Sequence, residues 1–181
     1  SYFGTPGPIP DGMASWLLTR QMADGGWNCE DWRGATHGSF HTTISVLEGL
    51  EAYRLARPAE AEKAADAVAA GREFLLAHRL YKSHRTGEVA DPVFTRFSFP
   101  PRWHYDVLRG LDYLAGVDAG RDPRVEDAID LVNGKRRDDG RWNLQHPHTG
   151  RLHFRMEQGG KPSRWNTLRA LRVLKWWSHT A

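Results

Sequence analysis

A four-residue pattern recurs three times along the chain, and its spacing constrains the fold more than any other feature. Each copy consists of Leu, a charged residue, a small residue and Leu, and the copies begin at Leu47, Leu108 and Leu168. These starting points are 61 and then 60 residues apart. Such regular spacing is typical of repeat proteins, in which each copy occupies an equivalent structural element.

Each copy lies in a stretch whose apolar residues follow helical spacing, and we name these stretches the inner helices. The apolar positions are Ile44, Leu47, Leu50 and Tyr53 in the first, Leu108, Leu111 and Leu114 in the second, and Leu168, Leu171 and Leu174 in the third. Gly49, Gly110 and Ala170 form a column of small residues in mid-helix. Because glycine there costs about 1 kcal/mol relative to alanine, we expect this column to mark close helix–helix approach.

Three further helices, the outer helices, are predicted to alternate with the inner ones, over residues 11–23, 59–79 and 123–137. Asp11 and the pair Asp122-Pro123 are typical of helix starts, and Pro58 precedes the second outer helix. The predicted order is outer then inner, three times over, which gives about three helical hairpins. We therefore expect an all-α protein with a single domain over residues 1–181.

Three long connections, roughly 24–38, 80–101 and 138–162, join these helices. Loops of this length are uncommon unless they are functional or packed internally. Two of them begin in the same way, because an outer helix ends, glycine turns the chain and a tryptophan follows at Trp27 or Trp142. We expect both indoles to be buried against their own glycine turns.

The first of these turns resembles a known repeat signature. Gln21-Met-Ala-Asp-Gly-Gly-Trp27 is similar to the Gln-and-Trp repeat of squalene–hopene and oxidosqualene cyclases, and Lys135–Trp142 resembles a degenerate copy with Arg136 in place of Gln. In that family the Gln amide covers a helix end and stacks on the Trp, which ties successive outer helices together. The resemblance implies this structural role for Gln21, Asp24, Gly25, Gly26, Trp27, Gly140 and Trp142.

The resemblance also implies an architecture and a superfamily. The expected fold is an α/α-toroid, here a partial (α/α)6-type barrel, because a complete toroid has about twice as many inner helices. Segment 40–50 is also similar to protein prenyltransferase β-subunits, in which a His heads an inner helix and ligates zinc. The chain departs from both families, since it has neither the Asp-x-Cys pair of the zinc site nor the Asp-x-Asp-Asp acid motif. Whether it is an enzyme is therefore left open.

The starts of the inner helices are expected to form one end of the ring, where the chemistry of this superfamily takes place. Aromatic faces there would stabilise an isoprenoid cation and polar groups would orient it. The candidate substrate-binding residues are Phe40, Trp103, Tyr105, Arg164, Trp165 and Asn166, and the candidate catalytic residues are His104, Asp106 and His41. Residues two apart on a helix do not face each other, so a direct His104–Asp106 pair is not expected. An equally weighted interpretation is that all these residues cap and pack the helices.

A metal site is the weaker interpretation of the Cys and His residues. Cys29, His37 and His41 are soft ligands, but their spacing matches no standard zinc motif. We therefore expect no metal and no cofactor. The histidines of the last long loop, His146, His148 and His153, are interpreted as solvated, and Arg96, Arg102 and Arg164 as either diphosphate ligands or surface residues.

Composition excludes several classes of function. The chain of 181 residues is 40% hydrophobic and 26% charged, so it is expected to be globular. Basic and acidic residues are interspersed and the net charge is only +3, which argues against nucleic-acid binding. A single Cys fits a reducing compartment, and no apolar run reaches membrane-spanning length, so we expect a cytoplasmic protein. The start at Ser1, followed by loop-like residues 2–10, suggests a fragment or processed product.

Three hypotheses of function follow from the sequence. The first is an isoprenoid-binding protein that resembles a terpene cyclase or prenyltransferase. The second is a non-catalytic toroid that binds a lipid or a protein. The third is a sugar-active (α/α)-barrel, which needs two carboxylates near its pocket, and Asp106 is the only candidate at the ring.

The ends of an incomplete ring are expected to be exposed. Trp16 and Leu17 would lie at one end, and Trp176 and Trp177 at the other, so we expect a homo-oligomer, most simply a dimer, or cover by missing repeats. Ion pairs between neighbouring hairpins, Glu48–Arg109 and Asp112–Arg172, would set their register.

Overall fold

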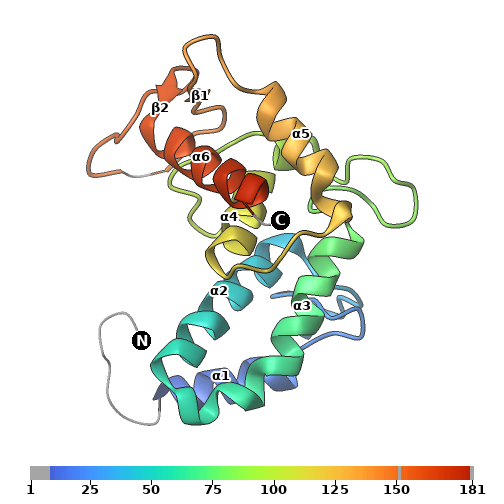
Figure 1. The fold of residues 1–181 in the computed structure, drawn as a ribbon. Helices are drawn as coiled ribbons and strands as arrows, with labels where there is room; N and C mark the ends of the chain where they lie inside the picture. Colours follow the sequence, from blue (N-terminus) through green and yellow to red (C-terminus); the bar gives the residue numbers. More distant parts are fainter. Residues whose placement is uncertain (1–8, 151, 180–181) are drawn as a thin grey trace. The chain divides into compact units, whose positions relative to one another are not determined.

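The computed structural model describes residues 9–150 and 152–179, and within them the protein is all-α (Figure 1). The α-helices are α1 (Ile9–Thr19), α2 (Phe40–Ala56), α3 (Ala65–Ala77), α4 (Val107–Gly116), α5 (Glu126–Gly134) and α6 (Arg164–His179). Short 3-10 helices are η1 (Asp31–Arg33), η2 (Pro58–Ala64), η3 (Pro92–Thr95) and η4 (Pro123–Val125). One antiparallel pair of two-residue strands joins β1 (Trp142–Asn143) to β2 (Pro162–Ser163). The six predicted helices are present in the predicted order, and the names outer (α1, α3, α5) and inner (α2, α4, α6) are kept for them.

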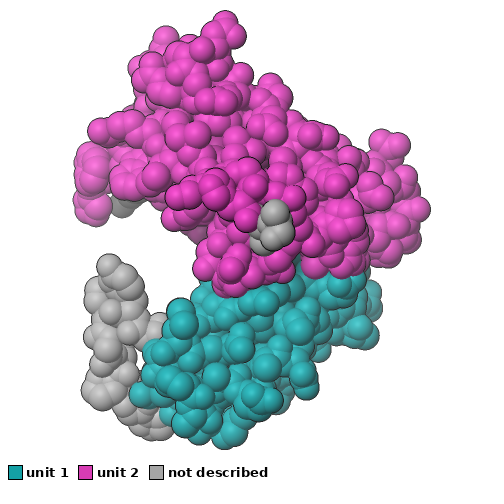
Figure 2. Space-filling model, in the orientation of Figure 1, with its two compact units in different colours: residues 1–75 teal, residues 76–181 magenta. Residues whose placement is uncertain are grey.

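The chain divides into two compact units (Figure 2). Unit 1 ends at Leu75 and contains α1, α2 and nearly all of α3. Unit 2 begins at Leu76 and contains α4, α5 and α6.

The core of unit 1 forms around α2. Ile44, Leu47 and Leu50 on one side of this helix are almost fully buried. Helix α3 approaches closely at Gly71, because a Cβ atom there would lie 2.6 Å from the Trp27 ring and 2.9 Å from the Leu47 side chain. The close approach is therefore made by a glycine of the outer helix.

The predicted role of the small-residue column is wrong at two of its positions. A Cβ atom at Gly49 would meet nothing within 4 Å in the described part of the chain, so none of the described helices packs closely against it. At Gly110 the nearest neighbour of a Cβ atom is the Tyr105 hydroxyl, and Tyr105 belongs to the segment that leads into the same helix. Ala170 is fully buried on α6, which packs against α4.

The core of unit 2 forms around α4. Leu108, Leu111 and Leu114 are buried there, with Ile129 and Val132 of α5. Helix α6 turns a different face inward than its leucines predict. Leu168 and Leu171 are 54% and 46% exposed, while the buried residues of α6 are Asn166, Arg169, Ala170 and Val173.

Buried Arg169 explains this choice of face, because it ties α6 to α4. Its Nε donates to Asp112 Oδ2 at 3.2 Å, and its Nη1 donates to the Ser98 carbonyl at 3.2 Å. Arg172 also pairs with Asp112, so the predicted Asp112–Arg172 pair is confirmed. The Glu48–Arg109 pair would join residues of the two units and stays a prediction.

The helix starts show which local signals were decisive. Asp122 caps η4 as expected, accepting from the backbone N–H of Arg124 at 2.8 Å. Ser163 caps α6, accepting from the backbone N–H of Asn166 at 2.9 Å. Asp11 was wrongly predicted as a cap, because α1 begins at Ile9 and the Asp11 carboxylate accepts from the Tyr53 hydroxyl. Residues 102–106 were predicted to be helical, but α4 begins only at Val107, since Asp106 is its cap.

The two tryptophan turns have the same construction. Trp27 is 2% exposed and Trp142 is fully buried, as predicted. Each indole Nε1 donates to the carbonyl ten residues earlier, at 2.8 Å from Trp27 to Leu17 and 2.7 Å from Trp142 to Val132. Gly25 and Gly140 turn the chain with φ of 83° and 77°, values that glycine adopts without strain.

Polar groups hold both turns to the following inner helix. The backbone N–H of Trp27 donates to Thr43 Oγ1 at 2.9 Å, and that of Trp142 to Thr167 Oγ1 at 3.1 Å. In the first turn, Asp24 also accepts from the N–H groups of Gly26 and Gly38. The carboxylate therefore satisfies donors that the tight turn would otherwise leave open.

The residue that precedes each glycine by four positions behaves differently in the two turns. Gln21 Nε2 donates to the Gly25 carbonyl at 2.8 Å and to the Ala67 carbonyl of α3 at 2.7 Å. Arg136 instead places its guanidinium over the Trp142 ring, 5.5 Å from the ring centre. The predicted tie between successive outer helices is thus made by Gln21 in unit 1.

Candidate binding cavity in unit 2

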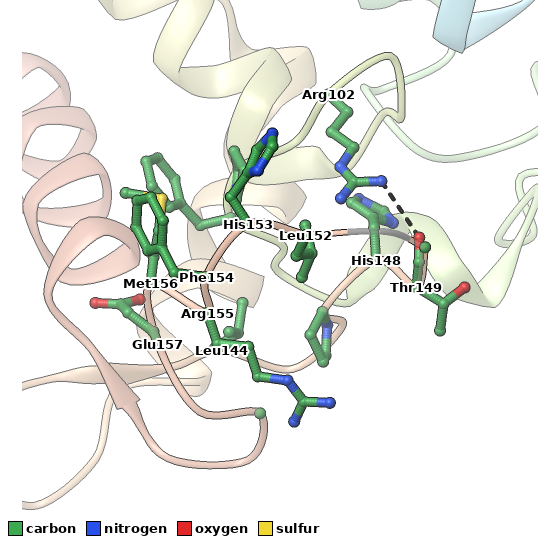
Figure 3. Close-up of a pocket in the computed structure, with 15 residues that line it drawn as sticks. Arg102, Leu144, His148, Thr149, Leu152, His153, Phe154, Arg155, Met156 and Glu157 are labelled. Atoms are coloured by element: carbon green, nitrogen blue, oxygen red, sulfur yellow. Dashed lines mark hydrogen bonds between the residues drawn. The ribbon is translucent and has the colours of Figure 1, made fainter.

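A cavity of about 430 Å³ lies in unit 2 (Figure 3). Its walls come from the segment before α4, residues 99–102, and from the connection between β1 and β2. Apolar side chains line most of it, namely Phe99, Leu144, Leu152, Phe154 and Met156. The volume lies in the range of small-molecule sites, about 300–1,000 Å³.

Backbone hydrogen bonds fix the base of this connection. The Leu144 N–H donates to the Lys161 carbonyl at 2.9 Å, and the Gly160 N–H donates to the Leu144 carbonyl at 2.7 Å. The N–H groups of Gln145 and His146 both donate to the Phe97 carbonyl. These bonds hold the loop against the segment before α4, and the apolar loop residues between them line the cavity.

Charged side chains reach the cavity from both walls. Arg102 Nη1 donates to the Thr149 carbonyl at 3.2 Å, and Arg155 is exposed on the loop (Figure 3). Glu157 accepts from the Ser163 hydroxyl and, at 2.7 Å, from the Arg164 N–H. Its side chain is 7% exposed. Glu157 therefore anchors the start of α6, while the two guanidinium groups can meet an anion.

A stack of aromatic rings borders the cavity. The rings of His104 and His148 are nearly parallel, with centroids 3.8 Å apart. The Trp103 ring also stacks on His104, with centroids 3.7 Å apart. His146 meets His148 edge-on at 5.1 Å. The Nε2 atom of His148 is buried and has no hydrogen-bond partner among residues 9–150 and 152–179.

This stack shifts the titration of its histidines. Burial, together with the neighbouring His104 and His146 rings, lowers the pKa of His148 to about 4. Burial also lowers the pKa of His104, with added repulsion from His146, Arg102 and Arg109. Both rings are therefore neutral near pH 7. The interpretation of His148 as a solvated loop residue was wrong.

Three of the candidate residues at the helix starts have structural roles. Asp106 is buried, and its carboxylate accepts from the Ser98 N–H and hydroxyl and from the Arg109 N–H, at 2.6–2.9 Å. The Tyr105 hydroxyl donates to the Leu80 carbonyl at 2.6 Å, and burial raises the pKa of Tyr105 well above its usual value. Buried Asn166 donates to the Asn143 carbonyl. These contacts match the capping and packing interpretation.

The other candidates of unit 2 lie beside the cavity. Trp165 stacks on Phe99, with ring centroids 5.0 Å apart, and Phe99 lines the cavity. Trp103 reaches it through the His104–His148 stack. Arg164 is exposed, with its Nε 3.8 Å from Glu157. Trp165 and Arg164 therefore contact residues that line the cavity, whereas none of the three side chains lines it.

Phe40 and His41 belong to unit 1. Cys29 and His37, which were considered with His41 as metal ligands, also belong to unit 1. Phe40 packs edge-on against Phe74, with ring centroids 5.5 Å apart, and His41 lies in the first turn of α2. Cys29 is exposed. Within residues 9–150 and 152–179, no group of three or more His, Cys, Asp or Glu side chains is placed to hold a metal ion.

Sequence reasoning missed the residues that form the wall. Leu152, Phe154, Arg155 and Met156 lie in a long irregular loop. One signal was present, because Leu152, Phe154 and Met156 alternate with polar residues in a loop that also carries three histidines. None of the helices in the described part of the chain is both long enough and apolar enough to cross a membrane.

Comparison of the chain with known protein families, curated proteins and solved structures finds no significant match.

Proposed function

We propose that unit 2 binds a small amphipathic molecule with an apolar chain and an anionic head, and that an isoprenoid phosphate is the best-fitting class. The observation that carries this proposal is the composition of the cavity wall. Phe99, Phe154 and Met156 offer apolar contact, while Arg102 and Arg155 offer guanidinium groups that match phosphate oxygens in geometry and charge.

The carboxylates favour binding over acid-initiated chemistry. Among the cavity-lining residues of the described chain, Glu157 is the only carboxylate, and Ser163 and Arg164 hold it. A sugar-active site would need a second carboxylate across the cavity. We therefore favour a binding protein of the α/α-toroid class, related in architecture to the terpene cyclases and prenyltransferases that the Trp27 turn resembles.

The proposal is tested by titrating the full chain with farnesyl diphosphate, farnesol and inorganic diphosphate in a calorimeter. We expect saturable binding of farnesyl diphosphate, and at least about tenfold weaker binding of farnesol, because tenfold corresponds to about 1.4 kcal/mol, the order of one charged hydrogen bond. Inorganic diphosphate alone should bind more weakly than farnesyl diphosphate, since it makes no apolar contact.

Variants separate the two halves of the ligand. Arg155→Gln should weaken farnesyl diphosphate binding and leave farnesol binding unchanged, whereas Phe154→Ala should weaken both. Arg102→Gln should weaken farnesyl diphosphate binding more than farnesol binding, because Arg102 also holds the cavity wall at Thr149. Arg85→Gln, on an exposed turn that does not line the cavity, is the matched control. The proposal fails if neither farnesyl diphosphate nor farnesol binds saturably, or if the Arg85 variant loses as much affinity as the cavity variants.

A further inference from the structure

Each unit exposes an apolar surface made of residues that do not line the cavity. In unit 1, Met13, Trp16, Leu17 and Trp32 form what we name the α1 surface. Trp16 is 58% and Trp32 is 70% exposed, and two neighbouring hollows on this surface share Trp16 and Leu17. A contiguous exposed patch that includes two indoles is typical of an interface.

In unit 2, α6 exposes Trp165, Leu168 and Leu171, which we name the α6 stripe. These residues are three apart, so they follow one another along one side of the helix. The predicted exposure of Trp176 and Trp177 was wrong, since both are half-buried and Arg121 lies over the Trp177 ring. The exposed apolar surface of α6 therefore lies nearer to its start.

The two surfaces differ in their electrostatic surroundings. The α1 surface is locally balanced, because Asp31 pairs with Arg20 at 3.4 Å and Glu30 pairs with Arg33 at 3.6 Å. The α6 stripe is cationic, because α6 contains no acidic residue and carries Arg164, Arg172 and Lys175 beside the stripe. The two units as wholes carry net charges of opposite sign. Residues 1–75 contain six Lys and Arg against ten Asp and Glu, a net charge of −4, while residues 76–181 contain nineteen against twelve, a net charge of +7.

We infer that the α1 surface of one copy of this chain binds the α6 stripe of a second copy. Contact between two α6 stripes would bring cations together, and contact between two copies of unit 1 would bring together two units of net charge −4, both of which cost free energy. The unlike pairing buries apolar area and joins a negatively charged unit to a positively charged one. It also continues the helix order of the chain, because α6 is an inner helix and α1 is an outer one.

Sedimentation velocity of the full chain at micromolar concentration tests the association. We expect a concentration-dependent mass above the 20.6 kDa of one chain. Trp16→Glu and Leu171→Glu each place an acid in the contact and should weaken association by about tenfold or more, as for central interface residues. Leu55→Glu, at a residue 84% exposed on α2 outside both surfaces, is the matched control and should associate like the wild type.

Mixing the two variants identifies the pairing. The Trp16→Glu chain keeps an intact α6 stripe and the Leu171→Glu chain keeps an intact α1 surface, so the mixture should form heteromers that neither variant forms alone. All three variants change exposed residues, and circular dichroism checks that each is folded. A monomeric wild type overturns the inference. So does wild-type association of either variant alone, or a mixture that associates no better than its components.

Discussion

The two tryptophan turns, one in each unit, share a backbone and differ in what they join. Both bury an indole that donates to the carbonyl ten residues earlier, and both turn at a glycine. In both, the tryptophan backbone N–H donates to a threonine hydroxyl of the next inner helix. Only Gln21 reaches a second outer helix, whereas Arg136 covers its own tryptophan. The repeat signature therefore has two separable parts, a turn that depends on Gly and Trp and a tie that depends on Gln.

The largest expected effect is the loss of either indole. Trp27→Ala and Trp142→Ala should each lower the free energy of unfolding by about 3–5 kcal/mol, because a large buried side chain and its hydrogen bond are removed. Hydrogen exchange read by mass spectrometry reports the two units separately. Each substitution should speed exchange mainly in its own unit.

Trp103→Ala is the control for both, since that side chain is 62% exposed and should cost under about 1 kcal/mol. If one buried tryptophan proved as tolerant as Trp103, the two turns would not be structurally equivalent. Trp27 and Trp142 would then contribute differently to the stability of their units.

The second expected effect is a pH dependence of the stability of unit 2. The folded-state pKa of His148 is about 4, below the value of about 6.5 expected in the unfolded chain, so the unfolded state binds more protons between these values. The stability that the neutral ring contributes is fully present above about pH 6.5 and is lost as the pH falls towards 4. Unit 2 should therefore lose exchange protection in this window. The effect is smaller than that of the indoles, because solvent near the ring screens its charge.

His148→Phe should reduce this loss in unit 2, because phenylalanine keeps a stacking ring that cannot be protonated. His153→Phe, at an exposed position of the same loop, is the matched control and should leave the pH profile unchanged. Equal profiles for the wild type and the His148 variant would show that the stack does not couple stability to pH.

The same contrast explains which features were predictable from the sequence. Trp27, Trp142 and the helix order follow from local signals, namely a glycine turn, a capping residue or an apolar period. The face of α6 was not predictable, because Arg169 is buried by an ion pair with Asp112, which lies 57 residues away along the chain. The cavity wall depends on a similar long-range bond, from Arg102 to the Thr149 carbonyl. The spacing of apolar residues carries no information about the partners of Arg169 and Arg102.

The smallest expected effect concerns the tie itself. Gln21→Ala removes two hydrogen bonds to the Gly25 and Ala67 carbonyls and should cost about 1–2 kcal/mol, given about 0.5–1.5 kcal/mol for each bond. Arg136→Ala removes a cation–π contact at an exposed side chain and should cost under about 1 kcal/mol. Urea unfolding of both variants measures the difference.

Exchanging the two residues makes the comparison sharper than deleting them. In Gln21→Arg the guanidinium must replace an amide that fits between two carbonyls, so unit 1 should be destabilised by about as much as in Gln21→Ala. Arg136→Gln should change the stability of unit 2 by no more than about 0.5 kcal/mol, because Arg136 contacts its own tryptophan rather than a second outer helix. If Arg136→Gln instead stabilised unit 2 and Gln21→Arg were neutral, the glutamine would contribute through the turn, and the tie to α3 would be incidental.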